Sequence, residues 1–105
     1  MRTEVSILHH DYPGDLRAQV EAKLLTLARF NDQAHSMTAR LGRQGNEHRV
    51  ELVAHISHGA TLVADVSQIR FSASLDEALD RMRCLLRKAR EKQVDSRRRS
   101  SPKIA

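Results

Sequence analysis

The chain has 105 residues, 40% of them hydrophobic and 30% charged, which suits one domain with a modest core and is too short for two. No apolar run approaches the roughly 20 residues that a membrane-spanning helix needs, and the first residues lack the layout of a secretory signal. The single cysteine, Cys84, has no internal disulfide partner. We therefore expect a cytoplasmic protein with no membrane partner.

The positive charge is concentrated at one end of the sequence. Residues 1–80 hold eight Lys or Arg against eleven Asp or Glu, a net of −3, whereas residues 81–105 hold ten against two, a net of +8. Basic segments attract nucleic acid because they neutralise phosphates and release counterions. The last quarter of the chain is therefore the predicted contact for a polyanion, although an acidic membrane surface or simple solubility could also account for the charge.

The chain is expected to begin with a strand and a helix. Residues 3–9 alternate weakly between apolar and polar, which is typical of a short strand, and residues 11–14 then break it. Apolar residues at steps of three and four predict a helix over residues 13–30 that packs on a sheet; they are Leu16, Val20, Leu24, Leu27 and Phe30.

Three further strands are predicted at about residues 35–43, 48–58 and 60–70, separated by turns that contain glycine. Apolar residues recur at every second position of these segments, which places them on the same face of the sheet. An antiparallel meander with one buried and one wet face follows from this pattern.

A second helix is expected from Ser74, because Ser74 and Glu77 match a capping box, and it should end near Gln93. Its apolar seam contains Leu75, Leu79, Met82, Leu86 and Ala89, widened by Ala78 and Leu85. We predict a domain over residues 1–94 and a basic, disordered tail over residues 95–105. The fold class is α+β in the order β-α-β-β-β-α, a four-stranded sheet with two helices packed on one face.

Residues 81–92 contain six Lys or Arg and a single acid, Glu91. With Met82 at the centre of the buried face and about 100° per residue, the basic residues fall on two flanks of the helix. One flank holds Arg83, Arg87 and Arg90, and the other holds Arg81, Lys88 and Lys92. Both flanks can reach phosphates, and the three arginines of residues 97–99 are a second, less specific candidate.

The sequence gives little support for a metal site, a cofactor or catalysis. Six scattered histidines lack the converging set of about four ligands that zinc needs; they are His9, His10, His35, His48, His55 and His58. Cys84 is expected on the exposed side of its helix without a base to activate it. We therefore predict a protein without cofactor, metal or small-molecule substrate that is not an enzyme.

Residues 3–93 resemble the ribosome hibernation-promoting factors, also called ribosome-associated inhibitors, in their short form. The order of elements agrees throughout, and the local matches are dispersed over both helices. They are Leu16, Arg17, Val20, Ala22, Lys23, Leu27 and Asp32, and then Ala78, Leu79, Asp80 and Arg81.

This resemblance implies a translation inhibitor that occupies the decoding channel of the small ribosomal subunit during dormancy or stress and is a monomer when free. It implies ribosomal RNA contacts by Arg17, Lys23, Arg81, Lys88, Arg90 and Lys92, to which the helical wheel alone adds Arg87. Two alternatives remain open from the residues themselves. One is a general double-stranded RNA-binding module, and the other is a protein-interaction domain of the same fold.

Overall fold

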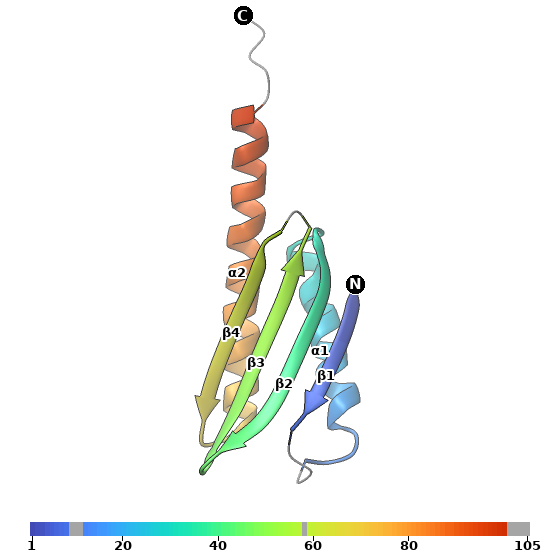
Figure 1. Ribbon diagram of the computed structural model, residues 1–105, viewed down its shortest axis with the longest axis vertical. Coiled ribbons are helices and arrows are strands. Elements are labelled where there is room, and N and C mark those ends of the chain that lie inside the picture. Colours follow the sequence, from blue (N-terminus) through green and yellow to red (C-terminus); the bar gives the residue numbers. More distant parts are fainter. Residues whose placement is uncertain (9–11, 58, 101–105) are drawn as a thin grey trace, which may run out of the picture.

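The computed structural model describes residues 1–8, 12–57 and 59–100, with side chains up to residue 92. Its elements follow the order β-α-β-β-β-α, and both helices cover the same face of one four-stranded sheet (Figure 1). The predicted fold class is therefore confirmed. No helix of the described residues covers the opposite face of the sheet, which we call the open face.

The sheet is mixed, with the strands in sequence order: β1 (Arg2–Ile7), β2 (Ala34–Gln44), β3 (Glu47–Ile56) and β4 (Thr61–Gln68). β1 and β2 are parallel, because the intervening helix crosses over the sheet between them. β2, β3 and β4 form the predicted antiparallel meander. Gly45, with a φ of 64°, makes the tight turn between β2 and β3. β1 and β4 are the two edge strands.

The period of two in the strands divides the sheet into a core face and an open face. In β3 the side chains of Val50, Leu52, Ala54 and Ile56 are buried beneath the helices, and the residues between them point to the open face. β4 follows the same alternation, with Ala64 and Val66 buried. The predicted apolar and wet faces are both present.

The first helix is α1 (Leu16–Leu27), followed by a single 3₁₀ turn, η1 (Ala28–Phe30). The predicted stripe is buried at its first four positions, and Phe30 is half-buried. The predicted start at Pro13 is slightly early, because Asp15 is the capping residue and its side chain makes no capping bond to the backbone. Its carboxylate instead accepts a hydrogen bond from Gln19 at 2.9 Å.

The second helix, α2 (Phe71–Ser100), packs on β3 and β4, and it is longer than predicted at both ends. The capping box at Ser74 is wrong. Ser74 lies inside the first turns, fully buried, and its hydroxyl donates to the carbonyl of His48 at 2.6 Å. Because this hydroxyl bonds to β3 across the fold, it does not cap the helix, which begins three residues earlier at Phe71.

The predicted end of α2 near Gln93 is also wrong, since the helix continues to Ser100 and extends well beyond the sheet (Figure 1). The residues after Gln93 include arginines, which favour helix, and no proline intervenes before Pro102. Residues 101–105 lie outside the described residues, so the role of residues 95–105 as a separate basic tail stays a prediction. Neither of the two described α-helices combines the length and apolar character needed to cross a membrane.

Candidate nucleic-acid interface

The basic flanks of α2 face two different neighbours. Arg87 points toward η1, where its guanidinium carbon lies 4.9 Å from the centroid of the Phe30 ring. Arg81 and Lys88 point toward the edge strand β4. The helical wheel therefore separated these residues correctly, because the seam between them, with Met82 and Leu86 fully buried, fixes the rotation of the helix on the sheet.

The flank beside β4 borders a groove of about 430 Å³ between α2 and the edge strand. Its charge is partly neutralised: Arg81 forms an ion pair with Glu77 at 3.2 Å and donates weakly to the main-chain carbonyl of Asp65 at 3.5 Å. The lining is mixed in character and consists of Val63, Ala64, Asp65, Asp80, Arg81, Cys84, Leu85 and Lys88. A phosphate entering this groove would meet the Asp80 carboxylate and the Asp65 main-chain carbonyl as well as two cations, because the Asp65 carboxylate bonds to Arg49 on the other face of the sheet.

The flank beside η1 also contains Arg83, which is half-buried. Its guanidinium pairs with Asp80 at 3.1 Å, and its Nε is buried without a hydrogen-bond partner in the described part of the chain. Arg87 is exposed and forms no ion pair with any described carboxylate. The unneutralised charge on this flank therefore begins at Arg87.

The last described turns of α2 project several cations into solvent. Lys88, Arg90 and Lys92 are exposed, and within residues 1–8, 12–57 and 59–92 none of them has a carboxylate at ion-pair distance. Long side chains of this kind can reach phosphates while their methylene stems cover the helix.

The two predicted contacts on α1 differ from each other. Arg17 donates a hydrogen bond to the main-chain carbonyl of Val5 in β1, so it is already engaged within the fold. Lys23 is exposed and makes no described side-chain hydrogen bond or ion pair. No described hydrogen bond or ion pair joins either residue to α2, so the structure does not gather all seven predicted residues into one cluster.

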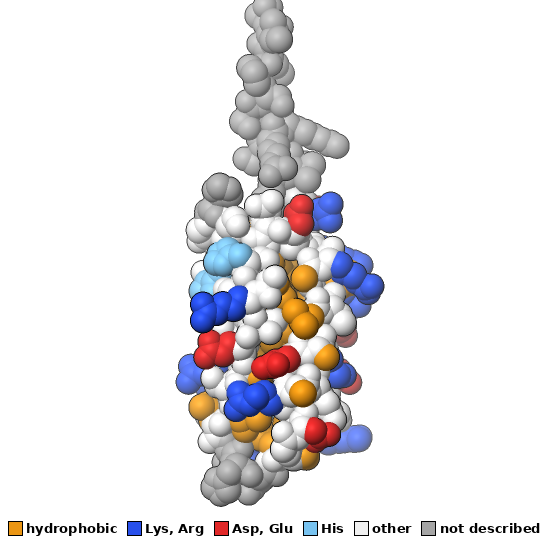
Figure 2. Space-filling view, turned by 90° about the vertical axis from the view of Figure 1, so that its right-hand side faces the viewer, with side chains coloured by type: hydrophobic (Ala, Val, Ile, Leu, Met, Phe, Trp, Pro, Cys, Tyr) orange, Lys and Arg blue, Asp and Glu red, His pale blue; other side chains and the backbone are white. Residues whose placement is uncertain are grey.

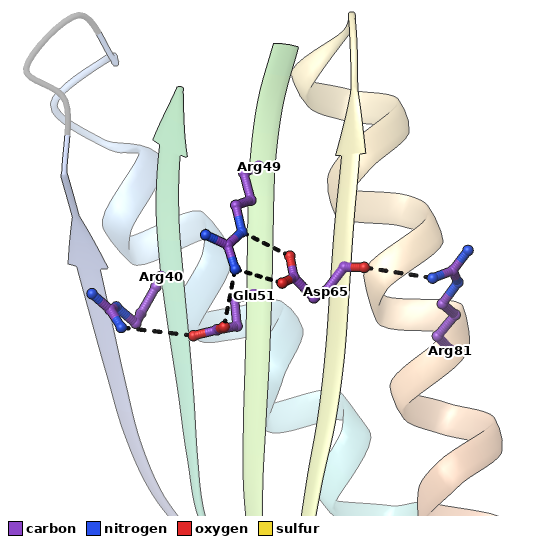
Figure 3. Close-up of polar contacts among 5 residues, drawn as sticks. All are labelled: Arg40, Arg49, Glu51, Asp65 and Arg81. Carbon is purple, nitrogen blue, oxygen red and sulfur yellow. Dashed lines mark hydrogen bonds and ion pairs between the residues drawn. The ribbon is translucent and has the colours of Figure 1, made fainter. Parts of the chain in front are cut away.

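On the open face of the sheet, arginines and carboxylates neutralise one another across three strands (Figure 3). Arg49 donates to both oxygens of Asp65, at 2.9 and 2.6 Å, and lies 3.5 Å from Glu51. Arg40 approaches Glu51 from β2 at 3.8 Å. The hydrogen bonds from Arg49 hold the pKa of the Asp65 carboxyl below its ordinary value of 3.8.

The two faces therefore differ as partners for a polyanion. Figure 2 shows the molecule from the side: over the sheet, basic and acidic side chains alternate beside histidines, whereas on the opposite side a group of Lys and Arg side chains projects outward. Because paired charges attract phosphate weakly, the helix side is the better candidate for nucleic acid.

The histidines do not form a metal site among the described residues. No group of three or more His, Cys, Asp or Glu could hold an ion there. His35 and His55 stack on the open face with ring centroids 6.3 Å apart, and His48 bonds to the Tyr12 hydroxyl at 2.9 Å. His9, His10 and His58 lie outside the described residues. Cys84 is exposed, as the wheel predicted.

Sequence reasoning missed the residues that connect η1 to α2. Arg29 lies 5.0 Å from the Phe30 centroid, so two guanidinium groups from two elements approach one ring. The wheel of a single helix cannot show this arrangement. The signal in the sequence that could have revealed it is Asn31, a polar residue directly after an apolar stripe. In the structure Asn31 is fully buried.

Comparisons with known proteins agree with this fold. The N-terminal domain of Thermus thermophilus Protein Y superposes with a TM-score of 0.74 at 22% identity, covering 86% of this chain and all of that domain. A ribosomal subunit interface protein from Coxiella burnetii gives a TM-score of 0.71 at 16% identity, covering 85% of this chain and 97% of that one. At these identities the likeness establishes the fold alone.

Comparison with curated protein sequences finds no match. The sequence model of one family, described as sigma 54 modulation protein / S30EA ribosomal protein, matches residues 3–94. This match covers nearly the whole described domain and agrees with the resemblance noted from the sequence. The chain therefore belongs to this family of ribosome-associated factors, which are binding proteins rather than enzymes.

Proposed function

We propose that this protein binds the small ribosomal subunit in the cytoplasm, occupies the decoding channel through contacts with ribosomal RNA, and so inhibits translation during dormancy or stress. Messenger and transfer RNA would be excluded by occupancy, with no bond made or broken. The observation that supports this most directly is the family match over residues 3–94.

The charge distribution is consistent with such a contact. α2 presents Arg87, Lys88, Arg90 and Lys92 as exposed cations without described carboxylate partners, while the charges on the open sheet face are balanced. RNA binding through such residues releases counterions, so it should weaken steeply as salt is raised. Lys23 would add a contact from α1, and Arg17 and Arg81 would do so only by exchanging their internal partners.

Sedimentation with ribosomes through sucrose gradients at low and moderate salt tests the proposal. We expect the chain to migrate with small subunits and whole ribosomes at low salt and to dissociate as salt increases. Competition with a bound messenger and transfer RNA tests the position on the subunit, since an occupant of the decoding channel must be displaced by them. Binding that is unaffected by these ligands would exclude the channel.

Two double charge reversals of equal size test whether α2 is the surface that binds the ribosome. Changing Lys88→Glu with Lys92→Glu should abolish co-sedimentation, whereas Arg2→Glu with Arg70→Glu changes the net charge equally at exposed positions away from this part of α2 and should have little effect. Arg81 is left unchanged because of its internal contacts. Equal loss in both variants would indicate a nonspecific attraction, and retention of binding by short RNA duplexes alone would favour a double-stranded RNA-binding module.

A further inference from the structure

Two arginines from different elements share one aromatic ring at the junction of η1 and α2. The guanidinium carbons of Arg29 and Arg87 lie 5.0 and 4.9 Å from the centroid of Phe30. Both distances are within the roughly 6 Å over which a cation is attracted to the face of a ring. The two guanidinium carbons are therefore at most about 10 Å apart. We call this set the Arg29–Phe30–Arg87 cluster.

A buried hydrogen bond fixes the cluster in place. Asn31, which is fully buried and directly follows Phe30, donates from Nδ2 to the carbonyl of Leu86 at 3.2 Å, and Leu86 directly precedes Arg87. The Asn31 carbonyl oxygen accepts from the amide of Gln33 at 2.9 Å, so both ends of its side chain are engaged. Phe30 itself packs against the core. The ring is thus held between the two elements before any ligand arrives.

Neither guanidinium group makes a hydrogen bond within the described residues, so their N–H donors remain available. Arg49, Arg81 and Arg83, by contrast, direct N–H groups at carboxylates or a carbonyl. Arg29 and Arg87 are both exposed, and neither forms an ion pair with a carboxylate in the described part of the chain.

Both cations lie within about 5 Å of one ring, so a single stretch of RNA backbone can reach both of them. A phosphodiester suits this arrangement, because arginine forks bind phosphate oxygens at two points. The face of an exposed guanidinium can also stack on an unpaired base.

We infer that the Arg29–Phe30–Arg87 cluster is a preorganised binding site for the sugar–phosphate backbone of ribosomal RNA, and that the flank of α2 beside η1 faces the RNA. This inference rests on the proposed function and adds Arg29 and Phe30 to its contacts. The opposite flank is less suitable, since Arg81 there is already paired with Glu77 at 3.2 Å and bonds to the main chain of β4.

The test measures equilibrium binding of the full chain to purified small ribosomal subunits over a series of potassium chloride concentrations. Arg29→Gln and Arg87→Gln should each weaken binding and lower the slope of log affinity against log salt by about one, because each removes a phosphate contact. Arg40→Gln is the control, an exposed arginine on the open sheet face whose loss should change neither quantity.

Phe30 provides a readout that simple charge loss cannot. Phe30→Leu should weaken binding by up to about tenfold, because the arginines lose their support, while the salt slope stays the same since no charge is removed. Phe30→Trp keeps an aromatic face and should bind at least as well as the original chain. Thermal unfolding of each variant identifies any loss that is due to misfolding.

The outcomes separate this inference from the proposed function. If the unaltered chain does not bind small subunits, the proposed function is wrong and the assignment of the cluster is lost with it. If the unaltered chain binds but folded Arg29→Gln, Arg87→Gln and Phe30→Leu bind equally well, only the inference is overturned. A loss restricted to Lys88→Glu with Lys92→Glu would then place the RNA elsewhere on α2.

Discussion

At the scale of single residues, Asn31 connects two parts of the chain that are 55 positions apart. Its side chain donates to Leu86 and accepts from Gln33, and its main chain makes two further hydrogen bonds, to Ala28 and Ala34. Buried polar groups are stabilising when all their partners are present. Asn31 therefore determines where the end of α1 meets α2.

Replacing Asn31→Ala should lower the free energy of unfolding by about 1–3 kcal/mol, because the buried Leu86 carbonyl and Gln33 amide lose side-chain partners. Urea unfolding measures this quantity. Asp32→Ala, at the exposed next position, is the control and should change it little. An equal effect of the two substitutions would mean that the buried bonds do not stabilise this junction.

Asp65 gives a dependence of stability on pH. Hydrogen bonds from Arg49 lower the pKa of Asp65 in the folded chain relative to its ordinary value of 3.8. The stabilisation is thus present above that value and is lost as the pH falls through the lower, folded pKa. Asp65→Asn should be slightly less stable than the original chain at neutral pH and equally stable in strong acid.

The measurement is the urea midpoint of both chains from neutral pH to well below 3.8. Asp32→Asn, an exposed carboxylate without a described hydrogen bond, is the comparison. A difference between Asp65→Asn and the original chain that persists unchanged into acid would contradict the assigned cause.

At the scale of elements, each edge strand of the sheet accepts a hydrogen bond from an arginine of the neighbouring helix. Arg17 of α1 donates to the carbonyl of Val5 in β1, and Arg81 of α2 donates to the carbonyl of Asp65 in β4. Exposed edge strands can pair with a further strand and so aggregate. A carbonyl that already accepts a hydrogen bond from a helix is less available for such pairing.

Removing both edge contacts with Arg17→Ala and Arg81→Ala should increase self-association as the protein is concentrated, which light scattering or gel filtration can follow. Lys23→Ala with Lys92→Ala lowers the charge equally on the same two helices at exposed positions without a described contact to an edge strand, and it should remain as monomeric as the original chain. Identical behaviour of the two double variants would show that net charge, not edge protection, limits association.

The elements also show how far sequence patterns reach. The period of two in β3 and the seam of α2 predicted the sheet, its buried face and the rotation of the second helix, because each depends on short, regular spacing. Ser74 misled the prediction, since its hydroxyl bonds to His48 across the fold, 26 positions away. The Arg29–Phe30–Arg87 cluster was missed for the same reason: it depends on contact between distant segments.

At the scale of the whole molecule, a compact sheet with two helices is joined to a helical extension. α2 continues past the sheet to Ser100 (Figure 1). The sequence of this extension is basic. The sequence places Arg97, Arg98 and Arg99 in this part. Their charge should add affinity for RNA without adding selectivity.

A chain ending at residue 94 should bind small subunits more weakly and with a smaller salt slope, yet it should keep its preference for small subunits over unrelated RNA. Replacing Arg97, Arg98 and Arg99 with Gln in the full chain separates charge from length and should reproduce most of the loss. A truncated chain that no longer distinguishes the subunit from unrelated RNA would assign selectivity to the tail.

The hydrogen bonds of Arg17 and Arg81 to the sheet edges bear on how relatives of this chain are compared. In a family that binds ribosomes, an arginine that persists at either position would ordinarily be counted as an RNA ligand. Here each of the two arginines bonds to a main-chain carbonyl of an edge strand. Selection for an intact fold would therefore preserve it even in a relative that no longer binds ribosomes. Arg29 and Arg87 have no described hydrogen-bond partner within the chain. Their replacement in a relative is therefore the better indication that it no longer binds RNA.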